Sequence, residues 1–406
     1  MYSGNCPNGR NSDSSNSIKY AFSPIPEHHS PMNQELAALL TLLKAGLWEK
    51  ELDELSLFPL SYKSWENVFY MAQCQTVTGI VWQGICRLPE NLLPPETLLL
   101  HWVAKADAIE RKNRKMNDTL IGLYGMFQKN GLHPVLQKGQ GVALLYEYPL
   151  LRECGDIDFY FPIKEESQYA ASLVQERGCK LQGEADGSIH YVWNGTTVEH
   201  HPRLLDISNP FKQKRSRKPE HDYGFYRVSL STKNDIRVTV PSPVLNLLLL
   251  NVHIMKHAFG WGVGLRQLCD MARACYSFHD IIDSYEIQKL YHDTGIGKWS
   301  RLLHSFLTDY LGLPAACLPY EEKSIVSTPL LDIIVRGGNF GQHAAGHRKT
   351  VPNIWKRKIN TSRAFLEHTC FSYRYAPQEA FWTFINLLMG QNYVKRLLFP
   401  SSGIYL

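Results

Sequence analysis

Two aspartates, Asp156 and Asp158, stand one residue apart in DIDFYF, a segment with the composition of a buried β-strand. Successive strand side chains point to opposite faces, so both carboxylates lie on one face and Ile157 and Phe159 lie on the other. Two like charges this close repel each other unless a cation holds them. Because magnesium prefers carboxylate and phosphate oxygens, the pair suits a metal-bound phosphate chain. The alternative is that both aspartates are solvated on an edge strand.

The turn KGQG, residues 138–141, is a second candidate feature, placed between a predicted strand (HPVLQ) and a predicted helix (GVALLYEY). Gly139 and Gly141 allow a ligand to approach the backbone closely, and free N–H groups at a helix start favour phosphate. It is not a Walker A loop, because no GxxxxGK[ST] pattern is present. Arg152, four residues before Asp156, could pair with a carboxylate or contact phosphate, and the alternative is an ordinary solvated arginine.

A third carboxylate, Glu199, lies in TTVEHH, which is separated from IHYVW by Asn194-Gly195. That dipeptide is the strongest short signal for a β-hairpin. Alternation places Glu199 and His201 on one face of the strand and His200 on the other. On an adjacent strand, Glu199 would complete a two-metal site with the aspartate pair; on an exposed strand it would be an ordinary surface glutamate.

The residue pattern changes twice along the chain and predicts three folded regions after a tail. Residues 1–32 are rich in Ser, Asn and Gly and are predicted to be disordered. Helical spacing of apolar residues fills 33–131, short strands and helices alternate over 132–241, and helical patterns return over 242–406. We therefore expect an α+β fold, with a mixed β-sheet core flanked by N-terminal and C-terminal helical regions.

The composition indicates a cytoplasmic protein with no membrane partner. The nine cysteines are scattered and show no CxxC spacing, which argues against a disulfide framework and against a structural zinc site. The first residues lack the pattern of a signal peptide, and the longest apolar run, VLNLLLLNVHIM, is too short and too polar to span a bilayer. The net charge of +5 is mild and hints at anionic ligands.

Taken together, these stretches resemble the uncharacterised bacterial nucleotidyltransferase family, within the nucleotidyltransferase superfamily related to DNA polymerase β. That family carries an LKG-type turn before an apolar helix, then R-x-x-x-D-[IV]-D, then V-[DE]-x-H. Two later helices carry H-x-x-K-H and R-x-L-x-D. The corresponding stretches here are residues 137–139, 152–158, 198–201, 243–257 and 266–270. The resemblance covers roughly residues 35–395.

The resemblance implies a metal-dependent transfer of a nucleoside monophosphate from a nucleoside triphosphate, such as ATP, to a hydroxyl or phosphate acceptor. The residues that would act in catalysis and bind Mg²⁺ or Mn²⁺ are Asp156, Asp158 and Glu199. The residues that would contact the nucleotide are Lys138, Gly139, Gln140, Arg152 and Lys256. Many relatives in the wider superfamily have Gly-Gly or Gly-Ser in the turn, so Gly139-Gln140 lacks a hydroxyl that often touches phosphate.

Two other functions stay open. One is a catalytically inactive protein that binds a nucleotide or a partner through the same cleft. The other is an RNA-directed nucleotidyltransferase, since basic clusters at residues 212–218 and 347–363 could guide an anionic acceptor such as tRNA. Such clusters are usually solvated loops, so nucleic acid is the less favoured partner. The acceptor itself is not specified by the sequence.

Further candidates lie on two predicted helices in the C-terminal region. His253 and His257 are spaced i, i+4 without an obvious third ligand, which favours a packing role over metal binding. Lys256 reaches phosphate if its face of the helix lines the cleft. Arg266 and Asp270, also at i, i+4, are predicted to form a salt bridge within their helix.

Overall fold

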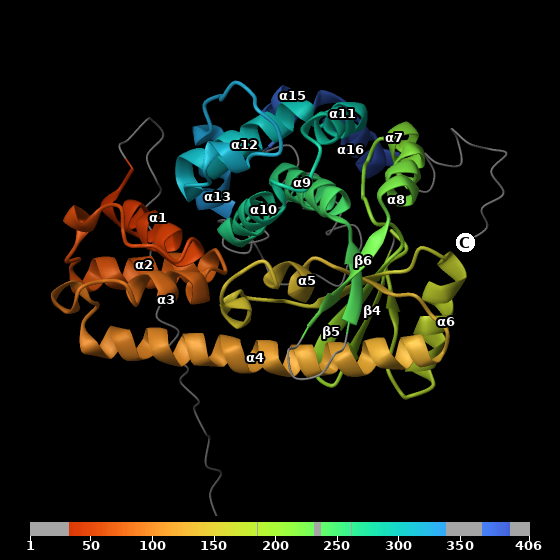
Figure 1. Ribbon diagram of the computed structural model, residues 1–406, viewed down its shortest axis with the longest axis horizontal. Helices are drawn as coiled ribbons and strands as arrows, with labels where there is room; N and C mark the ends of the chain where they lie inside the picture. The colour runs from red at the N-terminus through yellow and green to blue at the C-terminus, as the bar shows by residue number, and fades with distance from the viewer. Residues whose placement is uncertain (1–31, 185, 231–236, 261, 338–367, 390–406) are drawn as a thin grey trace, which may run out of the picture. The chain divides into compact units, whose positions relative to one another are not determined.

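The fold is built on a mixed β-sheet. The computed structural model describes residues 32–184, 186–230, 237–260, 262–337 and 368–389 (Figure 1). Within these residues the sheet has seven strands in the order β3-β4-β5-β2-β1-β7-β6. The strands are β1 (Val135–Gln137), β2 (Ile157–Tyr160), β3 (Gln182–Gly183), β4 (Ile189–Trp193), β5 (Thr196–His201), β6 (Phe225–Ser229) and β7 (Arg237–Pro241).

Two of the strand pairs are parallel, and they connect segments that are distant in the sequence. β2 runs parallel to β5, with Asp158 opposite Glu199. β1 runs parallel to β7, whereas β1 and β2 are antiparallel, with Gln137 opposite Asp158. The outer pairs β3–β4, β4–β5 and β6–β7 are antiparallel. The register therefore aligns three polar side chains across the central strands.

The hairpin predicted around Asn194-Gly195 is present. Asn194 and Gly195 form the turn between β4 and β5 with φ angles of 49° and 76°. Positive φ at both central positions matches the twist of the strands in a two-residue hairpin and is tolerated best by Asn and Gly. β6 and β7 form the second antiparallel pair, and part of their connection, residues 231–236, lies outside the described residues.

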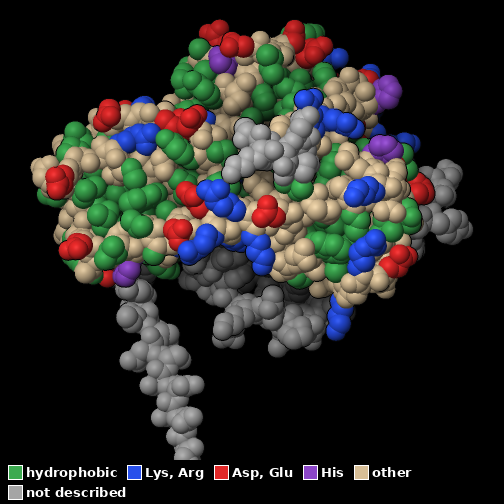
Figure 2. Space-filling view, turned by 60° about the horizontal axis from the view of Figure 1, so that its bottom comes forward, with side chains coloured by type: hydrophobic (Ala, Val, Ile, Leu, Met, Phe, Trp, Pro, Cys, Tyr) green, Lys and Arg blue, Asp and Glu red, His purple; other side chains and the backbone are tan. Residues whose placement is uncertain are grey.

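Helix α4 covers the apolar face of the sheet. Phe127 of α4 contacts Phe159 of β2 edge to face, with ring centroids 5.6 Å apart, and Figure 1 shows the long helix running along the sheet. The face turned forward in Figure 2 shows acidic and basic side chains interspersed. On α4 itself, Arg111 and Asp107 form an exposed ion pair. The carboxylates of β2 and β5 face away from α4, on the opposite face of the sheet.

The N-terminal region packs its helices closely. Its helices are α1 (Gln34–Leu47), α2 (Tyr62–Cys74), α3 (Thr78–Ile85) and α4 (Glu96–Lys129), with 3₁₀ turns η1 (Leu55–Leu57) and η2 (Glu90–Leu92). Helix α2 begins at a cap, where the Ser61 hydroxyl accepts a hydrogen bond from the Ser64 N–H. A Cβ added at Gly84 of α3 would lie 2.0 Å from the Leu42 carbonyl oxygen of α1, so only glycine permits this approach.

Short helices connect the strands. They are α5 (Gly139–Ala143), η3 (Pro149–Leu151), α6 (Lys164–Gln175), α7 (Pro210–Arg215) and α8 (Arg217–Tyr223). The predicted helix GVALLYEY is wrong in its extent, because α5 ends at Ala143. Tyr146 already bonds back only three residues, to the Ala143 carbonyl, and the approaching Pro149 disfavours helical conformation before it.

The C-terminal region is helical. It comprises α9 (Pro243–Phe259), α10 (Leu265–Phe278), α11 (Ser284–Thr294), α12 (Gly297–Leu311), η4 (Ala315–Cys317), α13 (Thr328–Gly337), α15 (Thr369–Tyr375) and α16 (Pro377–Met389). Helix α9 is buried along most of its length. The asparagines in its apolar run are buried, and Asn251 donates to the Ser300 hydroxyl of α12 at 3.0 Å. Among the described residues, no helix is long and apolar enough to cross a membrane.

The predicted α+β class with a mixed sheet and flanking helices is confirmed. The boundaries proposed for the three regions stay a prediction. The predicted disordered tail falls almost wholly outside the described residues, as does the basic cluster at 347–363.

Candidate functional site

A cavity of about 290 Å³ lies over the carboxylate face of the sheet, with residues of α9 and α10 in its wall. Acidic and cationic side chains line it together. The acidic residues are Asp156, Asp158, Asp186, Glu199, Asp206 and Asp270, and the cationic ones are Lys138, Arg152, Arg203, Lys256 and Arg266. Because buried charges are tolerated when they are paired, this mixture explains how so many ionisable groups share one small space.

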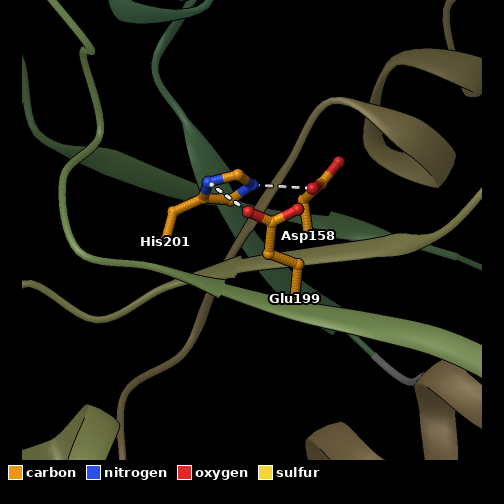
Figure 3. A group of neighbouring side chains, drawn as sticks. All are labelled: Asp158, Glu199 and His201. Atoms are coloured by element: carbon orange, nitrogen blue, oxygen red, sulfur yellow. Dashed lines mark hydrogen bonds and ion pairs between the residues drawn. The ribbon is translucent and has the colours of Figure 1, made fainter. Parts of the chain in front are cut away.

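The centre of the site is a group of three side chains from two neighbouring strands (Figure 3). His201 Nε2 lies 2.7 Å from Asp158 Oδ1, and His201 Nδ1 lies 3.4 Å from Glu199 Oε1. Asp158 and Glu199 are register partners on β2 and β5. His201 follows Glu199 by two residues, so strand alternation brings it to the same face. Glu199 therefore lies beside the strand that carries Asp158, as the sequence predicted.

Asp156 lines the same cavity from the residue just before β2 begins. The charge of Asp158 and burial raise its pKa to about 6. In Asp158 burial also opposes ionisation, but Lys138 and the hydrogen bond from His201 outweigh it and hold the pKa well below its usual range. Lys138 Nζ lies 3.6 Å from Asp158 Oδ2. The two aspartates thus repel each other, and a further cation near Asp156 would relieve that repulsion.

The turn before α5 holds the backbone in an unusual conformation. Lys138 has φ 45° and Gly139 has φ 41°, in the left-handed region that residues with a Cβ rarely adopt. Both residues line the cavity. Gln140 does not line it: its side chain is buried, and neither amide atom has a hydrogen-bond partner in the structure. Of the residues predicted to contact the nucleotide, all except Gln140 line the cavity.

Arg152 is buried and bound to Asp270 of α10. Its Nε lies 2.9 Å from Asp270 Oδ1 and its Nη2 lies 2.5 Å from Oδ2. The Tyr146 hydroxyl donates to the same carboxylate at 2.8 Å. The predicted salt bridge between Arg266 and Asp270 is therefore wrong: Asp270 bonds to Arg152, and Arg266 Nη1 donates to the Glu153 carbonyl at 2.9 Å. The i, i+4 spacing within one helix could not indicate that the partner of Asp270 comes from another segment of the chain.

Helix α9 supplies the wall opposite the carboxylates. His253, Lys256 and His257 all line the cavity, so Lys256 faces the cleft as the nucleotide-binding prediction requires. The Lys256 side chain is 52% exposed and forms an ion pair with Asp206, and the protein atoms around its ammonium lower its pKa by partial desolvation. Burial likewise lowers the pKa of His257 to about 3. The two histidine rings contact each other with centroids 4.4 Å apart, and the expected packing role of the pair stays a prediction.

The basic cluster at residues 212–218 lies on α7 and the beginning of α8. Asn209 caps α7 by accepting hydrogen bonds from the N–H groups of Phe211 and Lys212. Burial lowers the pKa of Lys212, so this lysine is partly packed against the protein and not fully solvated. No residue of the cluster lines the cavity wall.

Sequence reasoning assigned no role to two further residues of the site. His201 was placed on the correct face but given no function. Gln137 of β1 is 1% exposed, lines the cavity, and its Nε2 has no hydrogen-bond partner in the structure. The available signal for His201 was its position two residues after Glu199, whereas nothing local in the sequence marks Gln137.

Residues 61–312 match the family described as uncharacterised nucleotidyltransferase, a span that contains every predicted site residue. Among solved structures, an antigenic nucleotidyltransferase-like protein from Paracoccidioides brasiliensis is similar at 13% identity and a TM-score of 0.31. The similarity covers 50% of this chain and 96% of that one. No curated protein matches.

Proposed function

Because the chain belongs to the uncharacterised nucleotidyltransferase family, we propose that it is a metal-dependent enzyme. It transfers a nucleoside monophosphate from a nucleoside triphosphate to a hydroxyl or phosphate acceptor and releases pyrophosphate. The observation that carries this proposal is the meeting of Asp156, Asp158 and Glu199 in one cavity, beside the Lys138–Gly139 turn. Carboxylates concentrated in a space of this size require cationic partners.

The side chains present fit a divalent metal. The ligand atoms of Asp158, Glu199 and His201 all lie within 4.8 Å of one another, and carboxylate oxygens are the donors that Mg²⁺ and Mn²⁺ prefer. Asp156 stands next to this group with a pKa raised by Asp158. We assign Asp156, Asp158 and Glu199 as ligands of Mg²⁺ or Mn²⁺, which when bound stabilises charge on the entering and leaving oxygens.

The remaining lining residues would hold and orient the triphosphate. Lys138 lies beside Asp158 and its ammonium reaches the same space, so it complements a phosphate placed against the metal ligands. Gly139 offers backbone without a side chain in between. Lys256 approaches from α9, where a bound polyphosphate would compete with Asp206 for its ammonium. These groups place positive charge on two sides of a bound anion.

Gln140 and Arg152 act indirectly in this arrangement. Two groups of the Arg152 guanidinium, Nε and Nη2, donate hydrogen bonds to the Asp270 carboxylate. Arg152 therefore positions α10 against the strand that carries the aspartates. Gln140 is buried behind the turn. Because Gln140 supplies no hydroxyl to the turn, backbone groups would make the contacts to phosphate there.

Metal-dependent release of pyrophosphate is the direct test. The full chain would be incubated with each of the four nucleoside triphosphates and Mg²⁺ or Mn²⁺, with candidate acceptors, and pyrophosphate would be measured with a coupled assay. Asp158→Asn and Glu199→Gln keep the size of each side chain and remove its charge, and each is expected to lower the rate at least about 100-fold. The matched control is Asp107→Asn, an exposed carboxylate on α4 that should leave the rate unchanged.

The outcomes separate the candidate functions. Nucleotide binding that needs metal and Asp158, without pyrophosphate release, would identify a binding protein that uses the same cleft. Release that requires RNA, with binding that weakens steeply with salt and with neutralisation of residues 212–218, would identify an RNA-directed enzyme. Equal nucleotide binding in wild type and in the Asp156→Ala/Asp158→Ala variant would refute the site itself.

A further inference from the structure

His201 lies where a metal ligand would lie, and resting on the function proposed above, we propose that it binds the catalytic metal directly. The imidazole joins Asp158 and Glu199 as a nitrogen donor beside two carboxylates. A site of this mixed kind selects Mn²⁺, a first-row transition metal, over Mg²⁺. The three carboxylates assigned above would suit either ion equally, so the nitrogen is what decides the preference.

The spacing of the donor atoms supports this assignment. Neighbouring donors around a six-coordinate ion with bonds of about 2.1 Å lie about 3.0 Å apart. His201 Nε2 lies 2.7 Å from Asp158 Oδ1, and Nδ1 lies 3.4 Å from Glu199 Oε1. Each ring nitrogen therefore lies about as far from one carboxylate oxygen as neighbouring ligands of a six-coordinate ion lie from each other. A small rotation of the side chain would direct one nitrogen at a shared ion.

A buried amide next to this group points independently to a ligand. Gln137 stands opposite Asp158 in the antiparallel register of β1 and β2, so the two side chains share a face of the sheet. Its side chain is buried and lines the cavity, yet its Nε2 has no protein partner. A buried N–H without an acceptor is costly. With the Gln137 amide turned so that Nε2 faces the cavity, a water or phosphate oxygen bound to an ion at Asp158 would accept that hydrogen bond.

The type of ion follows from the donor set. Mg²⁺ keeps a shell of oxygen ligands and water and loses water reluctantly, whereas imidazole nitrogen is a ligand of first-row transition metals. Mn²⁺ accepts carboxylate oxygen and imidazole nitrogen together. Of the two ions assigned above, Mg²⁺ and Mn²⁺, Mn²⁺ is therefore the one whose binding gains from His201.

A second histidine offers a matched control. His190 of β4 also contacts Glu199, with Nε2 lying 3.5 Å from Oε1. It is not part of the cavity wall and is not a member of the group that could hold a metal within the described residues. Replacing it perturbs the surroundings of Glu199 without removing a proposed ligand.

The test is Mn²⁺ binding to the full chain, followed by electron paramagnetic resonance without nucleotide. Nitrogen hyperfine coupling on bound Mn²⁺ is expected in the wild type and in His190→Asn, and its loss is expected in His201→Asn. His201→Asn should weaken Mn²⁺ binding at least about tenfold. It should change Mg²⁺ affinity, measured by competition, less than about twofold. His201→Gln replaces His201→Asn if the latter fails to fold by circular dichroism.

Each result decides one of the two claims. Bound Mn²⁺ without nitrogen coupling in the wild type, or with coupling that survives in the His201 variants, overturns the role of His201. The proposed transfer reaction stands in that case if Asp158→Asn still abolishes pyrophosphate release. If no Mn²⁺ or Mg²⁺ binds, alone or with nucleotide, both the metal site and the proposed reaction are refuted.

Discussion

The buried ion pair between Arg152 and Asp270 provides a sharp test of how the site is held together. Both side chains are 4% exposed. Arg152→Met preserves most of the volume but leaves the Asp270 carboxylate buried with the Tyr146 hydroxyl as its remaining described donor. Leaving one charge of a buried pair without its partner costs about 3–5 kcal/mol. We expect Arg152→Met to lower the free energy of unfolding by that amount.

The chain contains a matched pair at the surface. Arg111 and Asp107 on α4 lie 2.6 Å apart with side chains 70% and 54% exposed. Because water screens such a pair, Arg111→Met should cost no more than about 0.5 kcal/mol. The same substitution at two Arg–Asp pairs of similar length therefore isolates the effect of burial. Urea unfolding followed by tryptophan fluorescence would give both values.

A second substitution separates lost charge pairing from lost packing. Asp270→Leu, added to Arg152→Met, removes the uncompensated carboxylate and should recover part of the stability. The reasoning is refuted if Arg152→Met costs no more than Arg111→Met. It is also refuted if the double variant is less stable than Arg152→Met alone.

Two further predictions concern packing and pH. Gly84→Ala should destabilise the protein by at least about 1–3 kcal/mol, because the new Cβ meets a backbone oxygen that cannot move aside. Gly122→Ala on α4, where a Cβ meets nothing within 4 Å, should stabilise it by about 0.4–1 kcal/mol; equal effects in thermal unfolding would contradict this. Partial desolvation of the half-exposed Lys256 side chain lowers its pKa to about 8, and a bound triphosphate favours its charged form. Triphosphate affinity should therefore fall about tenfold between pH 7 and 9. Lys256→Arg should remove that dependence, because guanidinium stays charged; calorimetry showing an unchanged slope would exclude Lys256 as its source. The charged groups around Lys256 are Asp186, Arg203, Lys138, Glu379 and Asp206.

Local chemistry in the sequence was sufficient for the parts of the fold that depend on neighbouring residues. Asn194 and Gly195 specify their turn because few other residues tolerate its backbone angles. Strand alternation correctly predicted that Asp158 of β2 and Glu199 of β5 point to the face of the sheet opposite its apolar face. The class of the fold followed from the change of pattern along the chain.

Tertiary contacts account for what the sequence did not reveal. Arg152 bonds to Asp270, which is remote in the sequence, so helical spacing selected the wrong partner, Arg266. The extent of α5 depends on the approach to Pro149, and its apolar residues alone suggested a longer helix. The position of Gln137 in the cavity wall results from its pairing with Asp158 across β1 and β2, which no local pattern encodes.

The parallel pairing of β2 with β5 has a consequence for how the protein folds and unfolds. Helix α6 and the strands β3 and β4 lie between the two strands in the chain, so β2 and β5 pair only when the chain has looped back across all of these residues. Closing such a loop is slow and entropically costly. An ion that binds Asp158 and Glu199 together would link the two strands, and it would stabilise only molecules in which they are paired. Retention of the metal during unfolding would therefore report that this strand pair is still intact.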